Sequence, residues 1–481
     1  MKKYLSYVMI SLFFISSLGV LISPAQDVES IEDIDPMVDL TVTLTIDSIR
    51  YLEATEEPPY PNLYVETQID GTTTTGPLWE DTPYLYDLLY SVTIDVSDTV
   101  EEIPITIKLF EKTDEGDILC DLGNESQDIQ LMYNMKTGHW TGDDYLKDPS
   151  GYGRCCGCDD GSRYRDERDC ELWFTITQND YDNDTLPYWT EVEVYQTNPL
   201  LNDLGSDEDG DGIPIEWEHH WGYDPFIVDD HAVLDDDIDS ITNIEEYLTW
   251  SYQSDPFRQD IFLEVDWMEE SPTGHRSMLP ELSKDLVKNP FHRRNILFHF
   301  DTTDHGGELI PYANKTEQPQ VLEIYNEFFL HQNTSSWRRS VFHYAIIVNR
   351  CNMKGFAFSG DTDPFWGYIP GTNGFVFSSS VMEEYADMNV LVGKSLPYVY
   401  GSVVMHEMGH NFGIRFGEPW GCDNWFAKYP WQPLYWTIRN YVSIMNYQYT
   451  YKYFDYSDGE NGWNDFDDWG NIDLTYFEKP Y

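Results

Sequence analysis

Two histidines and a glutamate that lie close together could carry hydrolytic chemistry. His406 and His410 are four residues apart in the stretch GSVVMHEMGHNFGI, so on a helix both imidazoles leave one face and can converge on one metal ion. Nitrogen ligands at this spacing suit zinc, which lowers the pKa of a bound water to roughly 7. Glu407 lies between the two histidines and can accept a proton from that water. The pattern predicts a zinc hydrolase with Glu407 as its general base.

A glycine and a methionine-containing segment follow this motif. Gly413 stands three residues after His410, where we expect the helix to end on a left-handed residue. The sequence SIMNY follows at residues 443–447. The combination resembles the metzincin clan of zinc metalloproteases, in which a methionine turn forms a floor beneath the metal. The resemblance implies a zinc endopeptidase, and it places Tyr447 near the zinc, where its hydroxyl can stabilise the developing oxyanion.

The sequence departs from this clan at the third zinc ligand. The clan has a histidine, or sometimes an aspartate, three residues after the glycine, and here Phe416 takes that position. Catalytic zinc needs three protein ligands and an open position, so another donor must complete the site. The nearest candidates are Asp423 and Glu418, and we favour Asp423 because the loop at 417–421 can carry it back to the metal. If neither binds, the alternative is a catalytically inactive, metzincin-like secreted protein for calcium binding or adhesion.

Two acidic segments have the spacing of a twelve-residue calcium loop, which takes oxygen ligands at positions 1, 3, 5, 7 and 12. The ligands expected in the first are Asp207, Asp209, Asp211, the carbonyl of Ile213, and Glu218; those in the second are Asp235, Asp237, Asp239, the carbonyl of Ile241, and Glu246. The segments resemble the calcium repeats of thrombospondin type 3 and dockerin-like linkers. Crowded carboxylates repel one another without a cation. We therefore expect a calcium-stiffened linker over residues 203–250.

The length and the charge of the chain limit its class. A chain of 481 residues is too long for one compact core and implies a multidomain protein. With 28 Lys and Arg against 86 Asp and Glu, the net charge is −58, which excludes a nucleic-acid partner and an anionic membrane surface. We expect protein or peptide substrates, and no feature of the sequence indicates an oligomeric state.

The N-terminus predicts export. Two lysines, an apolar run at residues 4–22 and small residues after it are typical of a signal peptide at 1–25, and a membrane anchor at 4–22 is the alternative. Seven cysteines in an exported chain predict disulfides, including a Cys351–Cys422 pair in the catalytic domain. The remaining cysteines predict further disulfides, or a zinc site at the CCxC motif; they are Cys120, Cys155, Cys156, Cys158 and Cys170.

Alternating apolar residues predict an antiparallel β-sandwich over residues 36–198. The expected strands lie at 38–46, 63–69, 90–96, 103–109, 172–176 and 189–194. The stretch 107–123, IKLFEKTDEGDILCDLG, resembles the strand and acidic loop of C2 domains, whose loops can hold calcium.

Strands and helices alternate in the remaining residues, 256–481, and predict an α/β, metzincin-like catalytic domain. The expected strands lie at 260–266, 295–301 and 341–349, and the expected helices at 278–288 and 321–331. Residues 374–378 are predicted to form an edge strand, along which an extended peptide substrate could pair. We also expect a final helix beyond residue 447.

Overall fold

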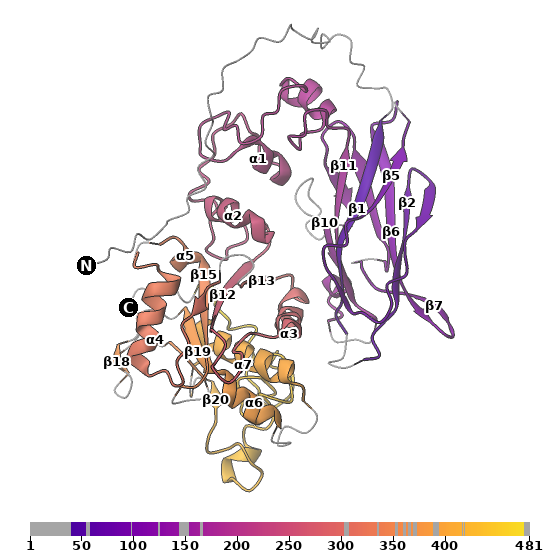
Figure 1. The fold of residues 1–481 in the computed structure, drawn as a ribbon. Helices are drawn as coiled ribbons and strands as arrows, with labels where there is room; N and C mark the ends of the chain where they lie inside the picture. The colour runs from indigo at the N-terminus through magenta and orange to yellow at the C-terminus, as the bar shows by residue number, and fades with distance from the viewer. Residues whose placement is uncertain are drawn as a thin grey trace, which may run out of the picture.

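The computed structural model describes residues 40–475 except 54–57, 98, 124–125, 144–152, 164–166, 303–306, 334–335, 352–354, 359–361, 364–366, 369–372, 388–393, 416 and 418. The predicted signal or anchor segment, Phe416 and Glu418 therefore lie outside the described residues. Figure 1 shows a β-sandwich beside an α/β unit, with short helices in the segment between them. Within the described part of the chain, no helix has the length and apolar character needed to cross a membrane.

Two antiparallel sheets form the N-terminal unit, which confirms the predicted β-sandwich. The first sheet contains β1 (Thr41–Tyr51), β4 (Tyr84–Leu85), β5 (Tyr90–Asp95), β10 (Gly153–Cys156) and β11 (Cys170–Gln178). The second contains β2 (Leu63–Ile69), β3 (Thr72–Thr75), β6 (Glu102–Thr113), β7 (Gly116–Leu119), β8 (Ile129–Asn134) and β9 (Trp140–Gly142). Alternate residues of β1 and β6 are buried and meet in one core, as the period of two predicts.

The strand predicted at 189–194 is wrong, because this segment is a π-helix, η3 (Thr190–Tyr195). Pro187 opens the turn, and the Glu191 N–H donates to its carbonyl over 3.1 Å. A proline cannot donate to a strand ladder but fits the first turn of a helix. The apparent alternation therefore arises from a helical turn whose Glu191 side chain is buried.

The linker has its own small core. The helices α1 (Ile215–Trp221) and α2 (Asn243–Thr249) and the 3₁₀ turn η4 (Trp250–Tyr252) follow the two acidic loops. Ile213, Trp217 and Trp221 are buried together in this segment. The loops are thus anchored by hydrophobic side chains on their C-terminal sides.

A mixed sheet forms the centre of the α/β unit. Its order is β13 (Leu297–Asp301), β12 (Asp260–Met268), β15 (Phe342–Val348), β19 (Gly374–Ser378) and β16 (Gly355–Ala357), and β14 (Leu309–Ile310) also pairs with β12. These strands are parallel except for β16, which runs antiparallel to β19. The prediction that 374–378 is the edge strand is therefore wrong. All five residues of β19 are buried, as in strands covered on both faces, and β16 lies outside it.

Helices cover both faces of this sheet. One face packs against α3 (Glu281–His292), α6 (Ser379–Asp387) and α7 (Leu396–Asn411), and the other against α4 (Gln318–Ile324), η5 (Tyr325–Phe329) and α5 (Arg338–Val341). The smaller elements are η2 (Gly157–Asp160), β17 (Thr362–Asp363), β18 (Gly367–Tyr368), β20 (Trp420–Asp423) and η6 (Pro433–Trp436).

The final helix predicted beyond residue 447 is not formed in the described part, up to residue 475. Aspartate side chains bind backbone and hydroxyl groups there instead. Asp468, for example, accepts hydrogen bonds from the Ser457 N–H at 3.0 Å and the Tyr441 hydroxyl at 2.7 Å. Local bonds, such as those from the Gly470 N–H to Asp467 at 2.8 Å and from the Thr475 N–H to Asp473 at 3.1 Å, compete with helix formation.

A buried cluster of charges joins the sandwich to the α/β unit. Glu171 of β11 accepts hydrogen bonds from Arg50 at 3.2 Å and Arg154 at 2.6 Å. Arg154 also donates to the His292 carbonyl of α3 at 2.9 Å, and Arg50 to Asn289. A buried carboxylate is costly unless it is paired in this way. The sandwich is therefore attached to α3, which packs against α7.

None of the seven cysteines, all of which the structure describes, forms a disulfide. The predicted Cys351–Cys422 pair is wrong because the two side chains belong to different cores. Cys422 packs in the cluster that contains α7, whereas Cys351 packs in the cluster on the other face of the sheet. The disulfides predicted among the sandwich cysteines are not formed either.

Candidate metal centre and active site

Helix α7 ends at the candidate metal centre. Ser395 caps its N-terminus by accepting a hydrogen bond from the Tyr398 N–H at 3.3 Å. At the other end Gly413 has φ of +95°, a left-handed conformation that glycine adopts without strain, as the sequence predicts. His406 and His410 thus lie on the last turns of a helix that is buried along most of its length.

Both imidazole rings are held by backbone carbonyls. Nδ1 of His406 lies 2.9 Å from the carbonyl oxygen of Ile444, and Nδ1 of His410 lies 2.6 Å from that of Ile414. A ring whose Nδ1–H donates to a carbonyl presents the lone pair of Nε2, as metal-binding histidines do. Each Nε2 is therefore oriented to accept a metal.

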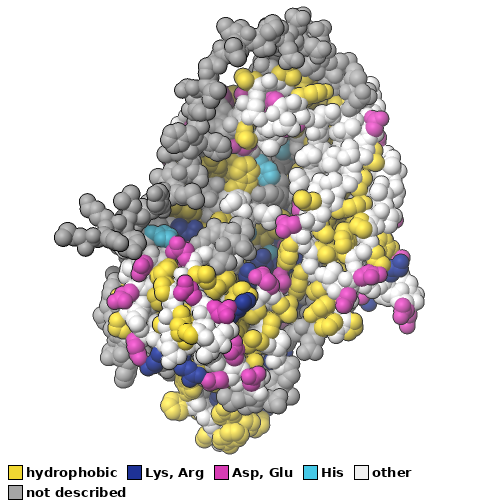
Figure 2. Space-filling model, viewed as in Figure 1, with side chains coloured by type: hydrophobic (Ala, Val, Ile, Leu, Met, Phe, Trp, Pro, Cys, Tyr) yellow, Lys and Arg dark blue, Asp and Glu magenta, His cyan; other side chains and the backbone are white. Residues whose placement is uncertain are grey.

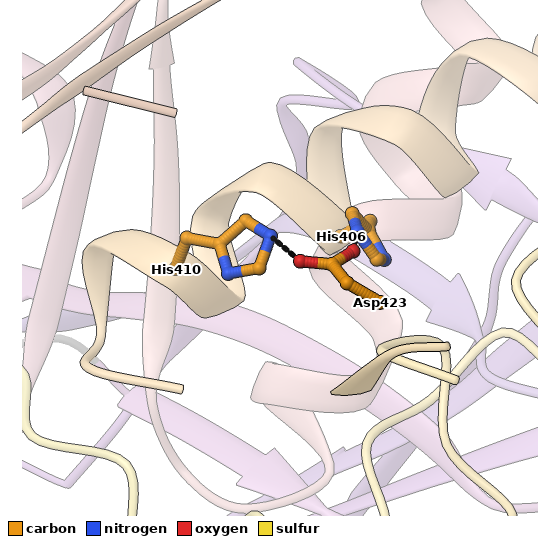
Figure 3. Close-up of side chains that lie close together, drawn as sticks. All are labelled: His406, His410 and Asp423. Atoms are coloured by element: carbon orange, nitrogen blue, oxygen red, sulfur yellow. Dashed lines mark hydrogen bonds and ion pairs between the residues drawn. The ribbon is translucent and has the colours of Figure 1, made fainter. Parts of the chain in front are cut away.

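The two Nε2 atoms meet the carboxylate of Asp423. Its Oδ1 is 3.1 Å from Nε2 of His406, and its Oδ2 is 3.3 Å from Nε2 of His410. Figure 3 shows the carboxylate between the two rings. Asp423 has φ of +52°, a conformation that aspartate tolerates better than most residues. Its N–H donates to the Met445 carbonyl at 3.1 Å, so the methionine segment positions both His406 and Asp423.

This donor set fits zinc. Four ligands about 2.0–2.1 Å from a tetrahedral zinc lie roughly 3.3 Å from one another, close to the two nitrogen–oxygen distances in the structure. The three donor atoms all lie within 4.8 Å of one another. Two imidazoles and one carboxylate also leave the open fourth position that a catalytic zinc requires.

The charges of the three side chains compensate one another. Burial alone would lower the pKa of His406, but the hydrogen bond and the charge of Asp423 outweigh it and raise that pKa to about 9. Burial would likewise raise the pKa of Asp423, yet the hydrogen bond from His406 and the charges of both histidines hold it below its usual range. Asp423 thus favours positive charge on His406, whereas burial lowers the pKa of His410 despite the charge of Asp423.

Met445 lies against the helix between the two histidines. A Cβ placed on Gly409 would be 2.4 Å from the Met445 Sδ, so only a glycine allows this contact. Tyr447 stacks on the His406 ring at 5.5 Å between centroids, and its hydroxyl is hydrogen-bonded to Asp423. The segment 443–447 therefore forms a floor beside all three donors.

Glu407 faces a cavity of about 820 Å³ that also contains the three donors. Burial, together with the charge of Asp423, raises the pKa of Glu407 to about 7 against the opposing charge of His406. Its Oε1 would be 2.9 Å from a Cβ placed on Gly355, so the carboxylate lies against strand β16. The arrangement places the Glu407 carboxylate between the donor set and strand β16, where a general base would be required.

Exposed aromatic residues lie beside this cavity. Trp425 lines it, and further large side chains of the same segment are more than half exposed: Trp420, Phe426, Trp431 and Trp436. Figure 2 shows hydrophobic surface at the lower end of the molecule, where Figure 1 draws this segment in yellow. Apolar surface therefore continues outward from the site.

The first acidic loop has the arrangement expected of a cation site. Asp207 accepts hydrogen bonds from the Gly210 and Gly212 N–H groups, and Asp211 accepts one from Ile213. Glu218 is fully buried, and neither of its carboxylate oxygens has a hydrogen-bond partner. Nε2 of His231 lies 3.8 Å from Glu218 and 3.3 Å from Asp211, so one imidazole faces several acids, and a bound cation would compensate the remaining negative charge. The sequence did not predict His231 as part of this site, because it lies outside the twelve-residue loop. One of its ring nitrogens nevertheless lies within 4.8 Å of carboxylate oxygens of Asp211 and Glu218.

The second acidic loop repeats the first. Asp235 accepts hydrogen bonds from the Ile238 and Ser240 N–H groups, and Asp239 accepts one from Ile241. Glu246 is buried with both oxygens unpaired, and one oxygen of Asp237 is unpaired as well, as is one oxygen of Asp209 in the first loop. Burial and the neighbouring carboxylates Asp239 and Asp235 raise the pKa of Asp237 to about 10. A divalent cation bound among these acids would relieve their mutual repulsion.

Two features of the metal centre could not be found in the sequence. The carbonyls of Ile414 and Ile444 orient the histidines, but a backbone oxygen leaves no signal in the residue type. Strand β16 has only three residues and no alternation that marks it as the edge of the sheet.

No family model and no curated protein matches the chain. Similar solved structures include a C2 domain, with 11% identity, a TM-score of 0.19 and coverage of 29% of this chain and 98% of that one. Human GIVD cytosolic phospholipase A2 has 11% identity and a TM-score of 0.19, and the match covers 29% of this chain but 16% of that one. A calcium-bound structure of two domains of extended-synaptotagmin 2 has 10% identity and a TM-score of 0.18, with coverage of 29% and 44%. Scores this low assign no function to the chain.

Proposed function

We propose that this chain is a secreted zinc-dependent endopeptidase of the metzincin type. The observation that carries the proposal is the convergence of the His406 and His410 Nε2 atoms on the Asp423 carboxylate. The methionine turn packs beside this donor set, and Glu407 faces the same cavity. Export is inferred from the apolar N-terminal segment of the sequence.

A zinc ion held by the three donors would supply an ionised water at neutral pH and polarise the scissile carbonyl. Glu407 accepts the proton of the attacking water and delivers it to the leaving amine. Tyr447, whose hydroxyl lies at Asp423, can donate a hydrogen bond to the oxyanion. The carbonyls of Ile444 and Ile414 keep the imidazoles in the tautomer that this chemistry needs.

The substrate that fits this site is an extended polypeptide. Among the described strands, β16 pairs only with β19, and the Ala357 backbone is hydrogen-bonded to the Glu407 carboxylate, so a peptide that follows this edge would reach the general base. Residues of β16 line the cavity, and Gly355 lies against the Glu407 carboxylate. A peptide paired with this edge would therefore present a carbonyl next to the general base.

The two linker loops are proposed to bind calcium for a structural purpose. Each loop contains a buried glutamate with unpaired oxygens, Glu218 or Glu246, and oxygen-rich sites of this spacing select a hard cation of calcium's size. Calcium would then hold together the segment that connects the sandwich with the α/β unit.

Casein cleavage by the purified full chain tests the proposed activity. We expect about one zinc per chain by elemental analysis, cleavage that stops with a phenanthroline chelator, and recovery after zinc is added back. Removal of calcium by dialysis against calcium-free buffer without a chelator should leave the zinc content unchanged. Zinc bound without any cleavage would instead support the inactive calcium-binding or adhesion protein, and a protein without zinc would contradict the proposed centre.

A further inference from the structure

A third acidic segment, whose last residues overlap the strand predicted at 189–194, has the same spacing as the two linker loops. Residues 180–191 read DYDNDTLPYWTE, with acids at positions 1, 3, 5 and 12. Position 8 is Pro187, and the first linker loop also has a proline at position 8, Pro214. Thr185 replaces the usual glycine at position 6, and it has φ of +78°, beside +104° for Gly212 and +75° for Ser240.

The hydrogen bonds of this segment match those of the linker loops one by one. Asp180 accepts from the N–H groups three and five residues ahead, Asn183 at 2.8 Å and Thr185 at 3.0 Å. Asp184 accepts from the N–H two residues ahead, Leu186, at 2.9 Å. Asp207 and Asp211 in the first loop, and Asp235 and Asp239 in the second, make the same contacts.

In each of the three segments, the aspartate at position 5 also accepts a hydrogen bond from the backbone N–H of an aspartate further along the chain. The second carboxylate oxygen of Asp184 accepts the Asp203 N–H at 3.1 Å. In the linker loops the corresponding donors are the N–H groups of Asp229, to Asp211 at 3.1 Å, and of Asp260, to Asp239 at 2.7 Å. The three units therefore share one architecture, not merely an acidic composition.

Unpaired buried oxygens point to a ligand at this third position. Glu191 has no exposed surface, and its Oε2 has no hydrogen-bond partner, while Oε1 accepts from Thr197. Both carboxylate oxygens of Asp182 are buried without partners as well. Glu191 lies with Asp184 and Asp203, all three oxygens being within 4.8 Å of one another. Burial and the charges of Asp184 and Asp182 raise the pKa of Glu191 to about 8.

We infer that residues 180–191 form a third calcium-binding loop. Its expected ligands are the carboxylates of Asp180, Asp182, Asp184, Glu191 and Asp203 and the carbonyl of Leu186. Crowded carboxylates with unpaired oxygens fit a hard divalent cation that accepts six to eight oxygen ligands. The bound ion connects the end of β11 to the beginning of the linker, because Asp203 lies beyond η3. The inference is independent of the zinc centre.

Calcium counting on the full chain tests this inference. The calcium bound by the Glu191→Gln variant is counted by equilibrium dialysis with radiolabelled calcium in excess magnesium. The matched control is Glu193→Gln, because Glu193 lies two residues further along the chain and its side chain is exposed. We expect Glu191→Gln to bind one calcium fewer than Glu193→Gln. Equal counts for the two variants would overturn the third loop.

Two further variants separate this result from the proposed linker sites. Glu218→Gln and Glu246→Gln should each lose one calcium if the linker loops bind it. If only Glu191→Gln loses a calcium, the result supports the third loop and contradicts the linker sites. If only Glu218→Gln and Glu246→Gln lose calcium, the result supports the linker sites and contradicts the third loop. Circular dichroism and thermal melting in a chelator establish that each variant is folded. If Glu191→Gln does not fold, Asp182→Asn takes its place, and an unchanged calcium count in that variant overturns the inference.

Discussion

Glu407→Gln is expected to reduce peptide hydrolysis by about 10²–10⁴-fold, the range that a positioned general base contributes. Glutamine keeps the shape of the side chain against Gly355 but cannot accept a proton. The reduction should appear in kcat, because the residue acts on the water during the reaction. Zinc content should stay at the parent level, since Glu407 is not one of the three converging donors.

The matched control for this variant is Glu323→Gln, an exposed residue of α4 on the opposite face of the sheet. It should cleave casein at the parent rate. A Glu407→Gln protein that retains most of its activity refutes the assigned base. If the variant loses zinc as well as activity, Glu407 contributes to zinc binding, and its assignment as a general base that does not bind the metal is wrong.

Asp423→Asn should weaken zinc binding by at least about 100-fold, the upper end of what is lost when a residue that merely supports a ligand is replaced. Asparagine tolerates the left-handed backbone at this position, where φ is +52°, so the change removes charge with little added strain. The loss of charge leaves the two imidazoles without their carboxylate partner. Zinc affinity is measured by competition with a fluorescent chelator, and casein cleavage is followed in parallel.

A surface aspartate provides the control for this prediction. Asp387→Asn, at the exposed end of α6, should bind zinc as tightly as the parent. If Asp423→Asn also binds zinc as tightly as the parent, another group is the third ligand. Glu418, the other candidate from the sequence, would then be tested by the same substitution.

The arrangement of the candidate metal centre was predictable from the sequence where the residues involved lie close together in the chain. His406, Glu407 and His410 share one helix, and the period of an α-helix alone puts the two rings on one face. Asp423 required a further assumption about chain reversal, for which the glycines at 413, 417 and 421 were the available signal. All three adopt positive φ in the structure. The carbonyls that hold the rings depend on tertiary packing, which residue types do not reveal.

The errors have a common origin in short-range patterns. The run at 189–194 alternates like a strand, yet its Glu191 faces a carboxylate cluster and its backbone is helical. Glu191 falls within the strand predicted at 189–194, although it is also position 12 of the acidic loop at 180–191. Residues 374–378 were predicted to form the edge of the sheet, whereas the edge strand is β16, which pairs antiparallel with β19. In both places long-range contacts override the local pattern.

X-ray absorption at the zinc edge, on the full chain loaded with one equivalent of zinc, tests the central claim most directly. The account predicts two imidazole nitrogens at about 2.0–2.1 Å and oxygen ligands at about 2.0–2.2 Å, with one oxygen lost in Asp423→Asn. Sulfur at about 2.3 Å, or a spectrum without histidine scattering, would place the zinc elsewhere and contradict the proposed centre.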